Sequence, residues 1–208
     1  MNKIAFVEGG IKTIYHEIGH IFGYCLANQK SNTYLGEIVE FSIGREKSCV
    51  GVENSYYHLH NVITEKERIL NNTKNKARTI AWFIEVISGC TFQTLFENKD
   101  FNLCFGYESS KGGNNDYSNI LIITSLCSFK FNMHDIFDLQ EKYSHIIRNY
   151  NLINQLQPII SEIKTELIAS DNIQVNFGQQ RINYFYDYCK NLITQELYNE
   201  YEKLIVEF

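Results

Sequence analysis

The segment His16-Glu17-Ile18-Gly19-His20 constrains this chain more than any other, because it places two histidines four residues apart. An α-helix turns about 100° per residue, so both imidazoles would lie on one face of a helix. There they can bind one Zn²⁺ at roughly 2.0–2.1 Å. Glu17 then lies beside the metal, where its carboxylate can take a proton from a water acidified by the metal and pass it to a leaving amine. The motif therefore supplies two metal ligands and a general base.

The residues around the motif predict a buried helix over residues 11–26. Apolar side chains recur there at three- and four-residue steps, and the segment contains no proline. A catalytic zinc site needs a third protein ligand and one open position. The metzincin pattern would place a third histidine at position 26, but this chain has Leu26, so that class is excluded.

Four carboxylates are candidates for the third ligand. Glu85 lies on an apolar helical pattern, whereas Glu37 and Glu40 lie in a stretch whose alternation explains them as solvent-facing charges. Asp116 follows a glycine-rich loop and stands at the start of an apolar periodic segment. An Asp in that position is commonly a helix N-cap, so the local sequence alone favours a capping role for it. The residues by themselves leave the third ligand open.

Three segments are similar to motifs of one known family. Tyr15-His16-Glu17-Ile18-Gly19-His20 resembles the Tyr-His-Glu-Ala-Gly-His signature of the FtsH-type ATP-dependent zinc metalloproteases, and residues 36–45 are similar to the strand and turn that follow it there. Ile84–Phe96 resembles the family helix that carries Gly-Gly-Arg-Ala-Ala-Glu-Glu. This chain has Cys90 at the arginine position and Gln93-Thr94 at the paired glutamates.

A fourth similarity covers residues 112–135, which resemble the family segment of glycine, Asn-Asp, a long helix and a closing Gly-Met-Ser-Asp. Asn115-Asp116 aligns with the Asn-Asp pair, and the Asp of that pair is the third zinc ligand in the family. The resemblance therefore implies that His16, His20 and Asp116 bind Zn²⁺ and that Glu17 is the catalytic residue. It extends over most of residues 11–165.

The chain is expected to be mainly α, an FtsH-peptidase-like helical domain with a small β element after the motif helix. One domain is expected over residues 1–208, with a core over 1–165 that resembles the family and a terminal helical hairpin over 166–208. A strand is expected within residues 34–52 and a loop over 171–178, with Pro158 at a break or a new helix start. The expected helices cover residues 64–96, 117–131, 135–156, 159–168 and 178–206.

Composition limits the partners and the location. At 208 residues and 44% hydrophobic content the chain can bury a substantial core, and no apolar run reaches the roughly 18–20 residues of a membrane span. A net charge of −5 without a clustered basic face argues against nucleic acid. Six cysteines without any Cys-x-x-Cys pair indicate buried, reduced thiols with no zinc role, and hence a cytoplasmic protein. His58 and His60 are interpreted as surface loop histidines.

These features predict a zinc-dependent metallopeptidase that hydrolyses peptides or unfolded proteins. The chain contains neither a Gly-x-x-x-x-Gly-Lys-Ser/Thr loop nor a membrane anchor, so we expect a stand-alone form without the AAA ATPase. A separate ATPase acting as unfoldase, and further copies of the chain, are candidate partners. The alternative function is a non-proteolytic metal-binding module, with a regulatory or interaction role, descended from such a peptidase. A zinc-bound Glu85 in place of Asp116 is a third possibility.

Overall fold

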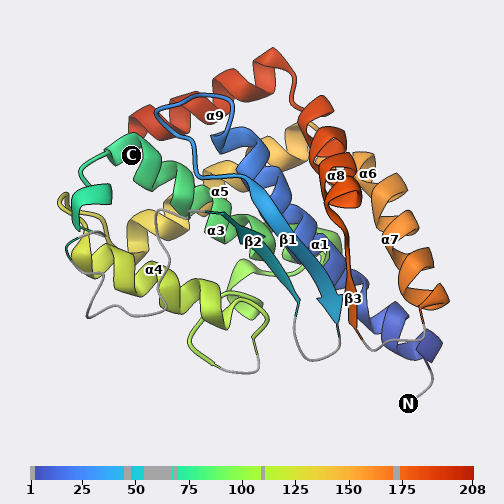
Figure 1. Ribbon diagram of the computed structural model, residues 1–208. Coiled ribbons are helices and arrows are strands. Elements are labelled where there is room, and N and C mark those ends of the chain that lie inside the picture. Colours follow the sequence, from blue (N-terminus) through green and yellow to red (C-terminus); the bar gives the residue numbers. More distant parts are fainter. Residues whose placement is uncertain (1–2, 45–47, 54–66, 68–69, 109–110, 171–173) are drawn as a thin grey trace.

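The fold is mainly helical, with a small antiparallel sheet on one side (Figure 1). A computed structural model describes residues 3–44, 48–53, 67, 70–108, 111–170 and 174–208. The helices are α1 (Lys3–Ala27), α3 (Lys76–Glu97), the short 3₁₀ helix η1 (Phe101–Leu103), α4 (Asn114–Leu126), α5 (Met133–Asn149), α6 (Leu152–Gln155), α7 (Gln157–Ala169), α8 (Gln179–Asn191) and α9 (Gln195–Glu207).

The crossing of α1 and α3 is the most extensive helix–helix contact of the fold. Two glycines one turn apart on α1 permit it, because a Cβ built on Gly19 would lie 2.6 Å from the backbone oxygen of Ser88. A Cβ built on Gly23 would lie 2.8 Å from Cα of Glu85. Both distances are shorter than real Cβ contacts, so larger side chains would force the helices apart. The crossing thus holds the His-Glu-x-x-His turn directly against α3.

The sheet has the strand order β2-β1-β3, with both pairings antiparallel. Phe41 pairs with Val50, and Ser42 pairs with Asn176. The third strand lies in the segment for which the sequence predicted only a loop, and that prediction was wrong. Such a strand gives little sequence signal because it is three residues long and only Val175 is even partly buried. The strands are β1 (Ile38–Gly44), β2 (Cys49–Val52) and β3 (Gln174–Asn176).

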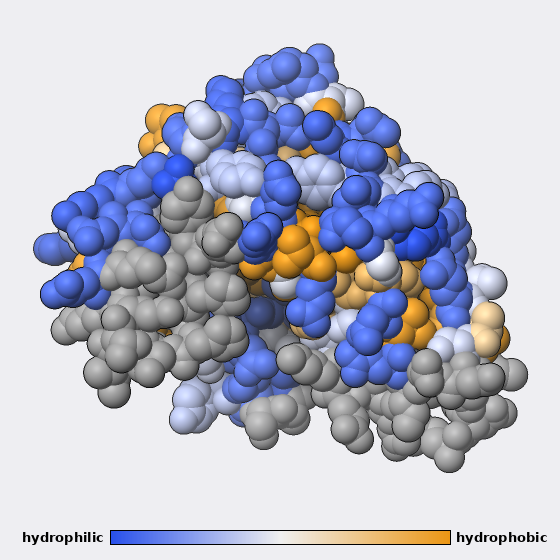
Figure 2. Space-filling model, in the orientation of Figure 1, coloured by the Kyte–Doolittle hydropathy of each residue, from blue (hydrophilic) through white to orange (hydrophobic). Residues whose placement is uncertain are grey.

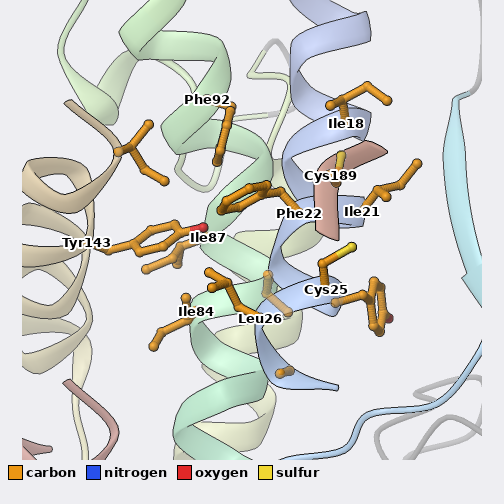
Figure 3. Close-up of a cluster of buried hydrophobic side chains, with 14 of the residues drawn as sticks. Ile18, Ile21, Phe22, Cys25, Leu26, Ile84, Ile87, Phe92, Tyr143 and Cys189 are labelled. Atoms are coloured by element: carbon orange, nitrogen blue, oxygen red, sulfur yellow. The ribbon is translucent and has the colours of Figure 1, made fainter. Parts of the chain in front are cut away.

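The hydrophobic core lies where α5 and α8 pack against the two crossing helices (Figure 3). The rings of Phe22 on α1 and Phe92 on α3 have centroids 5.4 Å apart. Tyr143 projects from α5 toward α3, where its hydroxyl accepts a hydrogen bond of 3.1 Å from Oγ of Ser88. Cys189 of α8 closes the core on the other side of α1. The packing of α3, α5 and α8 therefore fixes the position of the motif helix.

Most predicted helices are confirmed, although they begin or end at residues other than those predicted. The motif helix is confirmed within the longer α1, and Pro158 lies in the first turn of α7, as a new helix start requires. Two predictions were wrong in extent. The helix α4 ends at Leu126 because the backbone of Cys127 is extended (φ −58°, ψ 139°). The segment expected as one helix over 135–156 is divided, because Asn151 adopts a left-handed conformation (φ 52°) between α5 and α6.

The helix α3 is long and apolar enough to cross a membrane by length and composition alone. However, 89% of its most apolar window is buried inside the protein, so the core accounts for its apolar character. Among the residues coloured by hydropathy in Figure 2, polar ones cover most of the surface, and apolar ones reach it mainly near the centre of the view. His58 and His60, interpreted from the sequence as surface loop histidines, lie outside the described residues.

Candidate metal centre

Three side chains from two helices meet at one point. The helix α1 presents His16 and His20 on consecutive turns, with their Nε2 atoms 3.2 Å apart. The first turn of α4 brings in Asp116, whose Oδ2 lies 3.2 Å from Nε2 of His16 and 3.8 Å from Nε2 of His20. The three side chains are at most 16% exposed. The structure thus brings together the three residues that the resemblance singled out.

The capping role that the local sequence favoured for Asp116 is not observed. Gly113 occupies the N-cap position of α4, and no side chain caps that end of the helix. The Asp116 carboxylate points instead at the imidazoles of α1. The loop before α4, which packs against α3, therefore determines the position of the Asp116 side chain.

The spacing of these atoms suits a metal ion. Donor atoms at about 2.0–2.1 Å from a tetrahedral metal are roughly 3.3 Å from one another. The measured distances of 3.2, 3.2 and 3.8 Å lie close to that value. These three side chains form one of the groups in the described residues whose donor atoms are close enough to hold a metal ion.

The electrostatics of the site favour positive charge at its centre. Burial lowers the pKa of His20, but the carboxylates of Asp116 and Glu85 outweigh it and raise this pKa to about 9. The pKa of His16 is also raised, because hydrogen bonds to Asp116 and Cys104 outweigh its burial. Burial would raise the pKa of Asp116, but the two histidines lower it. The carboxylates of Asp116 and Glu85 therefore make this centre a favourable place for a cation.

The carboxylate of Glu17 faces the same centre without being part of the donor group. The residue is 6% exposed and lines the cavity in front of the histidines. Among the described residues, nothing donates a hydrogen bond to its carboxylate. Burial raises the pKa of Glu17 above the ordinary value for a glutamate. A raised pKa makes this carboxylate a stronger base, which suits a group that accepts a proton and returns it.

Glu85, the alternative ligand, binds the other side of His20. Its Oε1 lies 3.0 Å from Nδ1 of His20, and its backbone oxygen lies 3.2 Å from the same nitrogen. This arrangement fixes the imidazole with Nε2 toward the centre, as a carboxylate behind a metal-binding histidine does. The geometry gives Glu85 an orienting position. Glu37 and Glu40 are exposed on or beside β1, which confirms their solvent-facing interpretation.

Two cysteines lie behind His16, and the sequence did not predict this. Sγ of Cys90 and Sγ of Cys104 are 2.7 Å apart, and Sγ of Cys104 lies 4.0 Å from Nδ1 of His16. The hydrogen bond between Cys90 and Cys104 is the main factor that lowers the pKa of Cys104 to about 6. These two cysteines and His16 form a second group that could hold a metal ion. The one available sequence signal was Cys90 itself, at the position where the similar motif has an arginine.

Comparisons with known proteins add no further constraint. A scan against protein-family models, a search of curated proteins and a search of solved structures each find no match to this chain. The functional assignment therefore depends on the geometry of the site.

The cavity in front of the centre has a volume of about 560 Å³. One wall is the strand β2, and a second is the first turns of α4 with the loop before it. At the end beyond His20, Tyr24 of α1 and Trp82 and Val86 of α3 form a more apolar region. The Tyr24 ring is almost fully buried, and its hydroxyl has no hydrogen-bond partner among the described residues. The cavity thus joins a polar centre to an aromatic end.

Proposed function

We propose that this protein is a zinc-dependent metallopeptidase that hydrolyses peptide bonds in peptides or unfolded proteins. One observation carries the proposal: two imidazoles and one carboxylate converge at ligand spacing, with the free carboxylate of Glu17 beside them in an open cavity. Three protein ligands of this kind leave a fourth position for a substrate or a water, as catalytic zinc sites do. A purely structural site would need no such base.

The ligands of the metal would be His16, His20 and Asp116. Zinc bound there would acidify a water and polarise a carbonyl group. Glu17 would accept the proton of the attacking water and then donate it to the leaving amine, which its raised pKa favours. Glu85 would hold the ring of His20 in place throughout. Each of these roles uses a side chain that already faces the cavity or its ligands.

The substrate would lie along β2. This strand lines the cavity and is at the edge of the sheet, so among the described residues it pairs with β1 on one side only. An extended peptide can add to such an edge through backbone hydrogen bonds, which favour no particular side chain. Peptides and unfolded chains present extended segments more readily than folded proteins do, so the geometry favours them as substrates.

The similarity to the FtsH-type peptidase domain supports the same activity and is part of the proposal. With it come a separate ATPase or further copies of the chain as partners. A cytoplasmic location is also proposed, since all six cysteines are free thiols. A net charge of −5 and the acidic site make nucleic acid a poor partner.

The deciding experiment measures casein hydrolysis by the purified, zinc-loaded protein. Glu17→Gln keeps the size of the side chain and removes its basicity, so it should bind zinc normally and lose hydrolysis. Glu37→Gln, a change at an exposed glutamate, is the matched control and should remain active. Zinc bound by all three proteins with no cleavage by any of them would favour the non-proteolytic metal-binding module instead. The replacement of the family's arginine by Cys90 is the observation that keeps that alternative in view.

A further inference from the structure

We infer that Cys90 and Cys104 form a reversible disulfide, and that this redox modification weakens metal binding at the adjacent centre. The first observation is their distance. The two sulfur atoms are 2.7 Å apart, and a disulfide bond of about 2.05 Å requires them to approach by only roughly 0.7 Å. Cys90 lies in α3 and Cys104 directly follows η1, so side-chain rotation on two separate elements can close this gap.

A second metal ion fits this pair less well than a disulfide does. Two thiolates that bind one tetrahedral zinc at about 2.3 Å are roughly 3.7 Å apart. The observed distance of 2.7 Å is a full ångström shorter than that. The sulfur atoms would have to separate to hold a metal and approach to form a bond. The geometry favours the bond.

The pair contacts the metal centre through His16. Sγ of Cys104 is 4.0 Å from Nδ1 of that ring, on the side opposite the Nε2 atom that faces Asp116. Cys104 therefore stands behind His16 as Glu85 stands behind His20. Groups in this position orient a histidine ligand and raise its basicity. Drawing Cys104 toward Cys90 would remove this partner from His16.

A second connection runs to Asp116 through the loop before α4. The backbone N–H of Gly113 donates a hydrogen bond of 3.1 Å to the carbonyl oxygen of Cys104. A Cβ built on Gly113 would overlap Sγ of Cys90 and would lie 3.4 Å from Oδ2 of Asp116. The thiol pair thus lies directly beneath the turn that presents the third ligand. A movement of either sulfur atom would therefore displace the turn that carries Asp116.

The chemistry is a two-electron oxidation, and hydrogen peroxide is a sufficient oxidant. One sulfur attacks a peroxide oxygen and the O–O bond breaks, which gives a sulfenic acid and one water. The second thiol then attacks the sulfenic sulfur, the S–S bond forms and a second water leaves. Both thiols are buried, but the segment that carries Cys104 reaches the surface on either side of it, where Leu103 and Tyr107 are 63% and 78% exposed. Disulfides in reducing compartments are usually transient and serve as sensors, which suits a reversible bond here.

Peptide mapping tests the bond directly, because trypsin separates the two cysteines. Cleavage after Arg78, Lys99 and Lys111 places Cys90 in the peptide 79–99 and Cys104 in the peptide 100–111. The folded, metal-free protein is treated with hydrogen peroxide, blocked with iodoacetamide and digested without reductant. We expect the two peptides to be joined, to be released by dithiothreitol, and to be absent as a pair from Cys90→Ser. The peptide 112–130 carries Cys127 and should remain alkylated and unlinked.

The effect on the metal is measured separately, by zinc competition with a chromophoric chelator. This part rests on the proposed zinc site, whereas the mapping does not, so failure of the peptidase proposal would leave the disulfide testable. Oxidised protein should bind zinc about 10–100-fold more weakly than reduced protein, the usual effect of losing a partner behind a histidine ligand. Oxidation should not change zinc affinity in Cys90→Ser, and Cys127→Ser should behave as the wild type does.

Three results would overturn the inference. Peptides 79–99 and 100–111 that are recovered unlinked and alkylated after oxidation would exclude the bond. Equal zinc affinity of the oxidised and reduced proteins would exclude its effect on the centre. Two zinc ions per reduced chain, falling to one in Cys90→Ser, would identify the thiols as metal ligands instead.

Discussion

Gly89 of α3 lies against the imidazole of His20, so that a Cβ built on the glycine would be 2.5 Å from Nε2 of the histidine. The same Cβ would be 2.8 Å from Nε2 of His16. The two nitrogens that face the proposed metal therefore share one small surface on α3. Only a residue without a side chain leaves both imidazoles in place.

Replacing this glycine should impair metal binding more than folding. In Gly89→Ala the new methyl group would displace at least one imidazole, and we expect zinc affinity to fall by about tenfold or more. Gly10→Ala is the matched control, because it lies on α1 with nothing within 4 Å of the added Cβ. Both changes favour a helix by roughly 0.5–1 kcal/mol, so helix propensity cannot explain a difference between them. Equal zinc affinity of the two variants would show that Gly89 has no such role.

Glu85 offers a test that separates a ligand from an orienting residue. Glu85→Gln should still bind one zinc per chain, about 10–100-fold more weakly, because the amide is a poorer partner for Nδ1 of His20. Asp116→Ala should lose stoichiometric zinc at the same concentrations. Metal analysis after dialysis measures both. Full zinc content in Asp116→Ala together with its loss in Glu85→Ala would reverse the assignment.

The helical half of the site was predictable from the sequence because it is local. Four-residue spacing fixes His16 and His20 on one face, and the apolar periodicity around them specifies the helix. Asp116 was different, since it lies about 100 residues away and its local sequence favoured a cap. Its position depends on how Gly112 and Gly113 pack against α3, and only the resemblance pointed to it.

The thiol pair and the third strand could not have been predicted from local sequence, for related reasons. The chain between Cys90 and Cys104 consists of the end of α3 and the 3₁₀ helix η1. The periodicity of the sequence does not indicate which side chains such a connection brings together. The strand β3 pairs with β1 across more than 100 residues of chain. In both cases the partner is chosen by tertiary packing.

The core between α1 and α3 should tolerate truncation poorly. Phe22 is fully buried against Phe92, so Phe22→Ala would leave a cavity and lower the free energy of unfolding by about 3–5 kcal/mol. Val206→Ala removes apolar atoms from a residue that is 84% exposed and should change stability by less than about 0.5 kcal/mol. Urea denaturation of both variants measures these effects. Similar midpoints for the two would contradict the packing described for Phe22.

The hydroxyl of Tyr201 is buried on α9 and has no hydrogen-bond partner among the described residues. A buried polar group without a partner costs about 1–3 kcal/mol relative to its exposure to water. Tyr201→Phe keeps the ring and removes the hydroxyl, so it should raise the free energy of unfolding at neutral pH by about 1 kcal/mol. Tyr107→Phe, at a tyrosine that is 78% exposed, is the control and should change nothing.

Alkaline pH should enlarge the difference between these two variants. Burial raises the pKa of Tyr201 well above the value of 10.0 that it has in an unfolded chain, and burial raises the pKa of Tyr15 to about 12. A folded-state pKa above the unfolded one means that stability is fully present below pH 10 and is lost as the pH rises toward the folded value. The wild type and Tyr107→Phe should therefore lose stability steeply between pH values of about 10 and 12, and Tyr201→Phe should lose less. Urea midpoints at pH values of about 9 and 11, with tyrosinate absorbance as a second signal, test this. If Tyr201→Phe and Tyr107→Phe lose equal amounts of stability, the buried hydroxyl of Tyr201 does not cause the loss of stability at alkaline pH.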